Sequence, residues 1–410
     1  MFQRIKNYVH YIESFFAAIF YGFPAKKLTV IGVTGTDGKT TTTHLIYYLL
    51  SKAGKRASMI SSIDAKIGEK DYHTGLHTTT PRAWMVQKFL KEAVDKGSDF
   101  MVLETTSHAI EQNRVANIDF GVSVITNITQ EHSFHHRSMN NYIKAKTKLL
   151  LKSRISVINY DFTHFQTVKK LLDEKQKKYF TFSLIDKKAD FNWSSNFKTA
   201  IKGQYNKENI LAAYSVCRLL GLNDGELTLS IKTFSLPKGR LETVYKNHFE
   251  VVIDFAHTPN SIERLLSTIK EEFSFTGRVI HVFGAASQRD DLKRPLMGKA
   301  SGRYADVVIL TEEDYRHEPI NHIWKQIEQG LIEEGFKKNQ DEKIVDIANK
   351  SYLTIEDREE AILTAVKIAR RGDIIVLTGK SHEQSLNRNG KEYPWDEYKA
   401  VNSAVKKHNG

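Results

Sequence analysis

The chain has 410 residues, with 60 Lys and Arg against 48 Asp and Glu, which gives a net charge of +12. At roughly 100–200 residues per domain, this length predicts two or three domains that each bury their own core. A content of 40% hydrophobic residues excludes global disorder. The single cysteine, Cys217, can form neither an intramolecular disulfide nor a zinc-binding CxxC cluster, so we expect a cytoplasmic protein. No apolar run reaches the roughly 18 residues that a membrane-spanning helix needs.

The N-terminal segment is the first predicted element. Residues 8–23 (YVHYIESFFAAIFYGF) are rich in aromatic side chains, carry only Glu13 as a formal charge and lack a signal-peptide cleavage site. The favoured interpretation is a helix that packs on its own protein. The alternative is a helix that contacts a membrane surface peripherally.

Two series of strand-like apolar runs alternate with helical segments along the rest of the chain. The first series lies at residues 28–33, 99–104, 121–128 and 156–161, and the second at residues 250–255, 278–284, 305–311 and 373–379. Such alternation is typical of parallel sheets flanked by helices. The sequence therefore predicts two α/β domains, residues 28–236 and 237–410, after an N-terminal segment of residues 1–27.

A glycine-rich loop, GVTGTDGKTTTT at residues 32–43, lies between a predicted strand and a predicted helix. Gly35 and Gly38 let the backbone fold closely around a triphosphate, and successive N–H groups at the helix N-terminus attract the anion. Lys39 can reach the terminal phosphates and Thr40 can bind Mg²⁺. The spacing departs from GxxxxGK[ST], because Val33 stands at the first glycine position. An ordinary turn would explain the glycines but not the Lys-Thr pair, so the loop predicts ATP use.

A lysine falls on the apolar face of the helix predicted from Met139. Apolar residues recur at helical spacing along MNNYIKAKTKLLLKSR, and Lys146 lies among them, whereas Lys144 and Lys148 lie on the opposite face. The amine of Lys146 either extends to solvent, or it is neutralised or chemically modified, because a charged amine is costly in an apolar site. With Glu104 and His132, a derivatised Lys146 could complete a magnesium site.

The chain resembles the Mur ligase family over residues 28–405, and within it the UDP-N-acetylmuramoyl-tripeptide synthetase branch, which adds the third residue of the peptidoglycan stem peptide. The resemblance depends on motifs that occur in the family's order: TGTDGKTTT (34–42), TTP (79–81), ETTSHAIEQNR (104–114), TNITQEH (126–132), YIKAK (142–146), GQYNKEN (203–209), GR (239–240), DFAHTP (254–259), KRPLMG (293–298) and GKSHE (379–383). It implies a P-loop ATPase domain with a parallel central sheet, followed by a Rossmann-like α/β C-terminal domain.

The resemblance also implies roles for individual residues. Lys39, Lys146, Glu104 and His132 match catalytic residues. Lys146 is expected to carry a carbamate made from CO₂. The metal ligands are expected to be Thr40, Glu104, His132 and the modified Lys146. Positions that bind the nucleotide match Gly35, Thr36, Asp37, Gly38, Lys39, Thr40, Thr41, Asn127, Asn209, Arg240, Asp254 and His257. Positions that hold the muramoyl-peptide match Thr79, Thr80, Thr106, Gln112 and Arg114. The pocket for the incoming amino acid matches Arg294, Glu313, Asp314, Tyr315, Arg316, Gly379 and Glu383.

The implied activity is an ATP-dependent, Mg²⁺-dependent peptide ligase of peptidoglycan precursor synthesis, which adds a free amino acid to a UDP-N-acetylmuramoyl-dipeptide through an acyl phosphate. The family's diaminopimelate-adding members read D-N-P-R where this chain has residues 313–316. Arg316 is kept and could bind a distal carboxylate bidentately, so meso-diaminopimelate is preferred over L-lysine. Only about 27 residues precede the ATP-domain strand, whereas the family usually has a UDP-binding domain there. A non-UDP or membrane-borne carrier is therefore an alternative substrate.

Other interpretations compete with this one. A folylpolyglutamate synthase-like ligase would have about this length, but KRPLMG and GKSHE belong to the peptidoglycan branch. A catalytically idle binding protein would not need the set of Lys39, Thr40, Glu104, His132 and Lys146 to be intact. No nucleic-acid partner is expected, because the basic charge comes without a platform of aromatic and basic residues.

Overall fold

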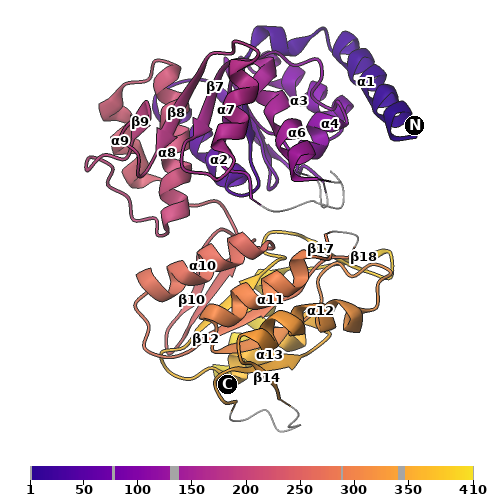
Figure 1. Ribbon diagram of the computed structural model, residues 1–410, viewed down its shortest axis with the longest axis vertical. Coiled ribbons are helices and arrows are strands. Elements are labelled where there is room, and N and C mark those ends of the chain that lie inside the picture. The colour runs from indigo at the N-terminus through magenta and orange to yellow at the C-terminus, as the bar shows by residue number, and fades with distance from the viewer. Residues whose placement is uncertain (1, 76–78, 130–137, 288–289, 340–346, 410) are drawn as a thin grey trace. The chain divides into compact units, whose positions relative to one another are not determined.

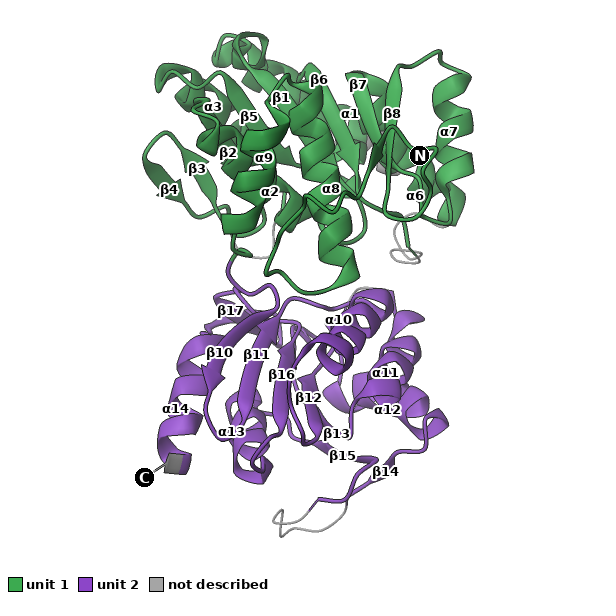
Figure 2. Ribbon diagram, turned by 90° about the vertical axis from the view of Figure 1, so that its left-hand side faces the viewer, with its two compact units in different colours: residues 1–237 green, residues 238–410 purple. Residues whose placement is uncertain are grey.

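The computed structural model describes residues 2–75, 79–129, 138–287, 290–339 and 347–409. The chain divides into two compact units, residues 1–237 and 238–410. Figure 2 shows them in different colours. Each unit has its own sheet, with helices packed on it (Figure 1).

The sheet of unit 1 has the strand order β4-β3-β2-β5-β1-β6-β7-β8-β9. Its strands are β1 (Thr29–Thr34), β2 (Ala57–Ile60), β3 (Ala65–Ile67), β4 (Lys70–Tyr72), β5 (Phe100–Glu104), β6 (Phe120–Ile125), β7 (Ser153–Asn159), β8 (Tyr179–Ser183) and β9 (Phe191–Asn192). Most neighbouring strands run parallel, as expected, but β3 pairs antiparallel with both β2 and β4. Only residues 61–64 separate β2 from β3, which is too short for the crossover that a parallel pair requires.

Helices cover both faces of this sheet. They are η1 (Pro24–Lys27), α2 (Lys39–Lys52), α3 (Ala83–Asp95), α4 (Ser107–Glu111), α6 (Met139–Lys152), α7 (Phe165–Asp173), α8 (Gln204–Leu219) and α9 (Asp224–Thr233). Apolar residues of α2, α8 and α9 pack with strand residues such as Val33 and Val124, and those of α3 pack with Val30 and Met101 on the other side. Because successive strand residues point to opposite faces, the continuous apolar runs indicate strands buried on both sides.

The N-terminal helix α1 (Phe2–Phe20) packs against α3 within unit 1. Small residues, Ser14, Ala17 and Ala18, are fully buried on the packed face, and the opposite face carries exposed aromatic and aliphatic side chains. Among the helices that the structure describes, none has both the length and the apolar character needed to cross a bilayer.

Unit 2 contains a second sheet with the order β10-β11-β16-β12-β13-β15-β14 and a separate hairpin, β17-β18. Its strands are β10 (Glu242–Lys246), β11 (Glu250–Asp254), β12 (Val279–Phe283), β13 (Val307–Leu310), β14 (Lys337–Lys338), β15 (Ser351–Thr354), β16 (Ile374–Thr378), β17 (Ser385–Arg388) and β18 (Lys391–Pro394). All pairs in the seven-stranded sheet are parallel except β10 with β11, which a tight turn connects. The four predicted strands of this domain are the buried centre of that sheet.

The helices of unit 2 lie on the two faces of this sheet (Figure 2). They are α10 (Pro259–Glu272), α11 (Lys293–Tyr304), α12 (Ile320–Glu333), α13 (Arg358–Ile368) and α14 (Glu397–Asn409). Residues of α13 and α14 form one apolar core with the strands. A fully buried ion pair joins these two helices, with Arg358 donating to both carboxylate oxygens of Glu397 at 2.9 and 2.6 Å. Such a pair is costly to break, because one charge would stay buried without its partner.

Candidate active site

The phosphate loop connects β1 to the N-terminus of α2. Close packing requires both of its central glycines: a Cβ on Gly35 would lie 1.9 Å from Thr126 Oγ1, and one on Gly38 would lie 2.1 Å from Asn209 Oδ1. Gly38 also has a φ of +80°, a left-handed backbone that favours glycine. The positions of Asn209 on α8 and Gly38 are therefore directly coupled.

Side chains from neighbouring strands and helices fix the shape of the loop. Asn127, just after β6, accepts a hydrogen bond from the Asp37 N–H at 2.9 Å through Oδ1 and donates to the Asp37 carbonyl at 3.2 Å through Nδ2. The Thr36 N–H donates to the Asn127 carbonyl at 3.0 Å. Lys39 Nζ donates to the Thr36 carbonyl at 2.7 Å, and Thr41 is buried in the first turn of α2. A rigid loop at a helix N-terminus is suited to bind an anion such as a polyphosphate.

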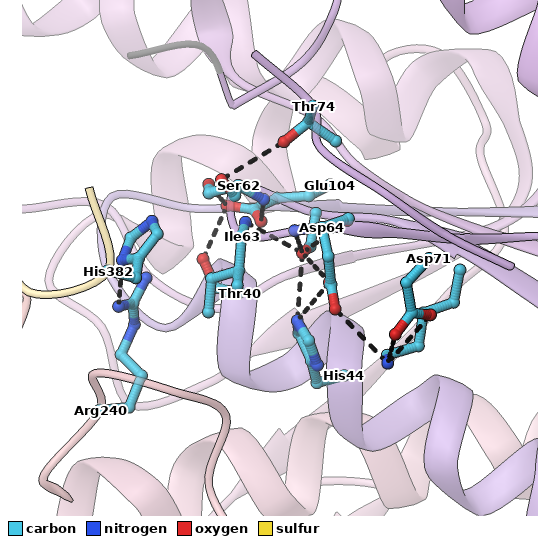
Figure 3. Close-up of polar contacts among 12 residues, drawn as sticks. Thr40, His44, Ser62, Ile63, Asp64, Asp71, Thr74, Glu104, Arg240 and His382 are labelled. Carbon is cyan, nitrogen blue, oxygen red and sulfur yellow. Dashed lines mark hydrogen bonds and ion pairs between the residues drawn. The ribbon is translucent and has the colours of Figure 1, made fainter. Parts of the chain in front are cut away.

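A buried carboxylate lies beside this loop, at the end of β5 (Figure 3). Glu104 is 1% exposed, and its Oε1 accepts hydrogen bonds from Thr40 Oγ1 at 3.1 Å and Ser62 Oγ at 2.9 Å. Its Oε2 accepts the Ser62 N–H at 2.8 Å. A carboxylate and a hydroxyl next to a phosphate-binding loop are the oxygen ligands that Mg²⁺ prefers, so Thr40 and Glu104 fit this metal.

Lys146 lies on the buried face of α6, as the helical periodicity predicts. It is 2% exposed, its Nζ donates to the Gly35 carbonyl at 2.5 Å, and it lies 4.5 Å from the centroid of the Tyr142 ring. The hydroxyls of Tyr142 and Thr36 are 3.1 Å apart. The structure thus brings Lys146 to the phosphate loop. The fourth predicted metal ligand, His132, lies outside the described residues.

The residues assigned to the muramoyl-peptide are linked to the backbone of Glu104 through Thr80. Thr80 Oγ1 donates to the Glu104 carbonyl at 2.9 Å and accepts the Thr106 N–H at 3.1 Å. Arg114 donates to the Thr80 carbonyl at 2.6 Å and to Gln112 Oε1 at 3.0 and 2.7 Å. Thr106 also caps α4 by accepting the N–H of the third residue after it.

The burial of Thr79 and the pKa of Arg114 are two further features of the residues assigned to the muramoyl-peptide. Thr79 precedes Thr80 and is half-buried. Burial, reinforced by the nearby Arg82, lowers the pKa of Arg114 below its usual value. An arginine that is partly desolvated in this way binds an anionic group more strongly than one in water, because the local dielectric is low.

In unit 2, Asp254 ends β11 and accepts hydrogen bonds from the two segments that carry the predicted nucleotide residues Arg240 and His257. Its Oδ2 accepts the Leu241 N–H and its Oδ1 accepts the Ala256 N–H, each at 2.7 Å. Burial raises the pKa of Asp254, while Arg240 and these hydrogen bonds oppose that effect.

Arg240 and His257 both lie against the Phe255 ring. The guanidinium of Arg240 is 4.8 Å from the centroid of Phe255 and 3.4 Å from His382 Nδ1, measured from Nη1. Figure 3 shows the pair formed with His382. The rings of His257 and Phe255 have centroids 4.8 Å apart, and His257 Nδ1 is 2.9 Å from the Phe255 carbonyl oxygen. The carbonyl of His257 accepts a hydrogen bond from Lys293 at 2.8 Å.

Two of the residues assigned to the incoming amino acid, Asp314 and Glu383, contact a buried lysine to which the sequence analysis assigned no role. Lys380 is fully buried and donates to Asp314 Oδ1 at 2.9 Å and Glu383 Oε2 at 2.5 Å. Burial alone would lower the pKa of Lys380, but these two carboxylates outweigh it and raise the pKa above its usual value. Next to it, Glu313 Oε2 is buried and accepts no hydrogen bond from a residue that the structure describes. A Cβ on Gly379 would lie 2.8 Å from that oxygen.

Intramolecular hydrogen bonds fix the two arginines among the residues assigned to the incoming amino acid. Arg294 is 1% exposed and donates to both carboxylate oxygens of Glu318, at 2.6 and 2.7 Å. Arg316 is half-buried, has a φ of +50° and donates to the Ser287 carbonyl at 2.8 Å. Burial raises the pKa of Tyr315 above its usual value.

Two domain families match the chain: the Mur ligase middle domain over residues 33–217 and the Mur ligase glutamate ligase domain over residues 239–381. The chain belongs to the Mur ligase family. Among curated relatives, the UDP-N-acetylmuramoyl-L-alanyl-D-glutamate–2,6-diaminopimelate ligase of Aquifex aeolicus is 34% identical over 401 residues, which cover 93% of this chain and 78% of the relative. The protein of the same name from Nostoc sp. is 37% identical over 394 residues, 90% of this chain and 75% of the relative.

Solved structures agree with this membership. A structure of a UDP-N-acetylmuramoyl-L-alanyl-D-glutamate–2,6-diaminopimelate ligase is 28% identical, with a TM-score of 0.59, and the match covers 93% of this chain and 79% of that one. Folylpolyglutamate synthase of Mycobacterium tuberculosis, solved with ADP and AMPPCP, is 15% identical with a TM-score of 0.69, and the match covers 90% and 92%. At that identity the second likeness concerns the fold alone.

These findings confirm the family and the α/β fold class expected from the sequence, and they do not favour the folylpolyglutamate synthase alternative. The roles assigned to single residues stay predictions. Sequence reasoning missed Ser62, which holds Glu104, and Lys380. Lys380 stands inside the GKSHE motif, so a lysine directly after a strand and a glycine was an available signal. Ser62 follows β2, a four-residue strand that no apolar alternation revealed.

Two glycines allow a matched test of the phosphate loop. Gly38→Ala should weaken ATP or ADP binding at least tenfold, because its Cβ would meet Asn209 Oδ1 at 2.1 Å. Gly54, with a φ of +70°, has no heavy atom within 4 Å of the place that a Cβ would take, so Gly54→Ala should cost only about 1–2 kcal/mol of stability. Nucleotide titration calorimetry and urea unfolding measure the two effects. Equal nucleotide affinity in both variants would contradict this role of Gly38.

Proposed function

We propose that this chain is an ATP-dependent peptide ligase of peptidoglycan precursor synthesis. It joins meso-diaminopimelate to a UDP-N-acetylmuramoyl-dipeptide and releases ADP and phosphate. One observation carries the proposal: Glu104 contacts the phosphate-loop residue Thr40 through its carboxylate at 3.1 Å and Thr80 of the predicted substrate group through its carbonyl at 2.9 Å. The residues for the phosphoryl group and those for the acyl substrate therefore adjoin within one unit.

The chemistry follows from the poor reactivity of a carboxylate. A carboxylate oxygen of the muramoyl-dipeptide attacks the terminal phosphorus of ATP, and ADP leaves, which gives an acyl phosphate. The amine of the incoming amino acid attacks the acyl carbon and phosphate leaves with the bridging oxygen. Lys39 and the loop N–H groups offset negative charge on the transferred group. Arg114 and the threonines beside it hold the acyl substrate.

Mg²⁺ and a carbamate on Lys146 belong to this proposal. Thr40, Glu104, His132 and the carbamate would hold the metal, which lowers the charge repulsion between the phosphates and the incoming carboxylate. A buried lysine beside the phosphate loop supports the carbamate, because the modification replaces a cation with an anion that can bind a metal.

The acceptor is proposed as meso-diaminopimelate rather than L-lysine. The names of the curated relatives and the retention of Arg316 support this choice. In unit 2, the cluster of Asp314, Lys380 and Glu383 lies next to the Glu313 oxygen that no described residue satisfies. A buried carboxylate oxygen of this kind attracts an ammonium group of the acceptor.

We further propose a cytoplasmic location, which the single, buried cysteine Cys217 supports.

The direct test is phosphate release from ATP and Mg²⁺ in the presence of the UDP-linked muramoyl dipeptide and one amino acid at a time. We expect turnover with meso-diaminopimelate to exceed that with L-lysine at least tenfold in kcat/KM. Turnover only with a glutamyl-folate would contradict the proposal. Turnover only with a lipid-linked muramoyl peptide would show that the substrate is carried by a lipid and not by UDP.

Lys146 has a matched control on the same helix. Lys146→Ala should abolish ligation, whereas Lys148→Ala, on the exposed face of α6, should retain it within about twofold. Depleting dissolved CO₂ should slow the wild-type enzyme, and added bicarbonate should restore it. A Lys146→Ala enzyme that still ligates, or a wild-type rate that does not respond to CO₂, would contradict the carbamate.

We also propose that the exposed face of α1 contacts an anionic phospholipid surface. This face comprises Tyr8, Val9, Tyr11, Ile12, Phe15, Phe16, Ile19 and Phe20. Trp84 of α3 extends it, with its ring 5.6 Å from that of Phe20. Three exposed lysines, Lys26 and Lys27 of η1 and Lys88 of α3, complement an anionic surface. Aromatic side chains accompanied by cations are typical of helices that lie in a membrane interface.

Vesicle flotation tests this contact. The protein should float with phosphatidylcholine–phosphatidylglycerol vesicles but not with phosphatidylcholine alone, and Phe16→Ser with Phe20→Ser should abolish flotation. Leu229→Ser, which removes an exposed apolar side chain from α9, is the control and should float normally. Absence of flotation, together with a dimer in sedimentation that the double variant dissociates, would show instead that the face binds a second copy.

A further inference from the structure

The turn of residues 61–64, between β2 and β3, is held by a histidine of the phosphate-loop helix. His44 lies one helical turn beyond Thr40 on α2, and its Nε2 is 3.1 Å from Ser61 Oγ and 3.3 Å from Asp64 Oδ1. The single proton of Ser61 Oγ is shared between the Asp64 carbonyl and carboxylate, each at 3.0 Å, and the same oxygen accepts the N–H groups of residues 63 and 64 at 3.2 Å. Figure 3 shows His44, Asp64 and Ser62 near Glu104.

The same turn supplies two hydrogen bonds to the Glu104 carboxylate. The Ser62 N–H donates to Oε2 at 2.8 Å and the Ser62 hydroxyl donates to Oε1 at 2.9 Å. A main-chain donor can hold a carboxylate only if its own backbone is fixed. Ser61 is fully buried, and the His44 and Asp64 side chains are 12% and 21% exposed, so the support of the turn is largely shielded from water.

The charge state of Asp64 suits this arrangement. Burial alone would raise the pKa of Asp64, but its hydrogen bond with His44 and the proximity of His44 and Lys66 outweigh that effect and lower the pKa. The anionic carboxylate therefore stays an acceptor for Ser61 and His44 at neutral pH. Lys66 Nζ lies 3.5 Å from Asp64 and 3.1 Å from Asp71 on the neighbouring strand.

We propose that His44 and Asp64 are positioning residues of the metal site. Through the turn of residues 61–64 they hold Ser62, and Ser62 fixes the Glu104 carboxylate beside Thr40. The inference rests on the proposed function, because it takes Glu104 as a metal ligand. In this role both residues act on the metal indirectly, through Ser62 and Glu104.

The size of the expected effect comes from the general behaviour of groups that orient metal ligands. Their removal typically weakens metal binding by about 10–100-fold, because the ligand loses its fixed orientation. In this chain one side chain, His44, connects the helix that bears Thr40 with the turn that orients Glu104. Removing it should therefore loosen the metal site while leaving the fold of the phosphate loop intact.

The test compares His44→Leu with His44→Gln. Leucine keeps the bulk and loses the hydrogen bonds, whereas the glutamine amide can replace the Nε2 contact. Mn²⁺ serves as a spectroscopic probe for Mg²⁺, and its affinity for the ADP-bound protein is measured by electron paramagnetic resonance. We expect His44→Leu to bind Mn²⁺ roughly tenfold more weakly and His44→Gln to stay within about threefold of wild type. The metal-free affinity for ADP should be the same in all three proteins.

Two further variants separate the possible failures. Asp71→Asn weakens the exposed contact with Lys66 on the β3–β4 hairpin and should leave Mn²⁺ affinity unchanged. Glu104→Gln should lose Mn²⁺ affinity if the proposed metal site is correct, and unchanged affinity would overturn that site. If Glu104→Gln loses affinity but His44→Leu does not, or if His44→Leu and His44→Gln lose it equally, the positioning role is overturned while the proposed function stands.

Discussion

The arrangement of unit 1 depends on one buried carboxylate. Glu104 is almost fully excluded from solvent, and a carboxylate in that position is stable only when donors surround it. The Thr40 hydroxyl of α2 and the hydroxyl and N–H of Ser62, in the turn after β2, provide these donors. The need to satisfy one anion therefore fixes α2, β5 and the turn after β2 against each other.

The order of strands makes this possible. β1 lies between β5 and β6, so the loops that follow these three parallel strands meet at one edge of the sheet, where such folds bind their ligands. The loop after β1 is the proposed phosphate site, Glu104 ends β5, and Asn127 after β6 fixes the loop backbone. The carbonyl of Glu104 also accepts the Thr80 hydroxyl, which links the proposed metal site to the proposed acyl-substrate site. The proposed ligation needs this proximity, because a phosphoryl group passes between the two.

The sequence predicted the strands and helices whose apolar residues form continuous runs or recur at a regular spacing. Continuous apolar runs indicated the central strands, and the helical spacing from Met139 put Lys146 on a buried face. The edge strands β3 and β4, at three residues each, are too short to show a period, so the antiparallel edge and the turn that holds Ser62 went unseen. Lys380 stands in the GKSHE motif, where its partner Glu383 follows three residues later. Its other partner, Asp314, is 66 residues away in sequence, and local pattern cannot reveal that contact.

The proposed ligation depends on phosphorylation of a substrate carboxylate before the amide bond forms. A muramoyl dipeptide whose acceptor carboxylate carries ¹⁸O in both oxygens reports on this step. Each phosphate released during ligation should contain one ¹⁸O atom, because the bridging oxygen of the acyl phosphate leaves with the phosphorus. Release of unlabelled phosphate during ligation would show that the carboxylate is not phosphorylated.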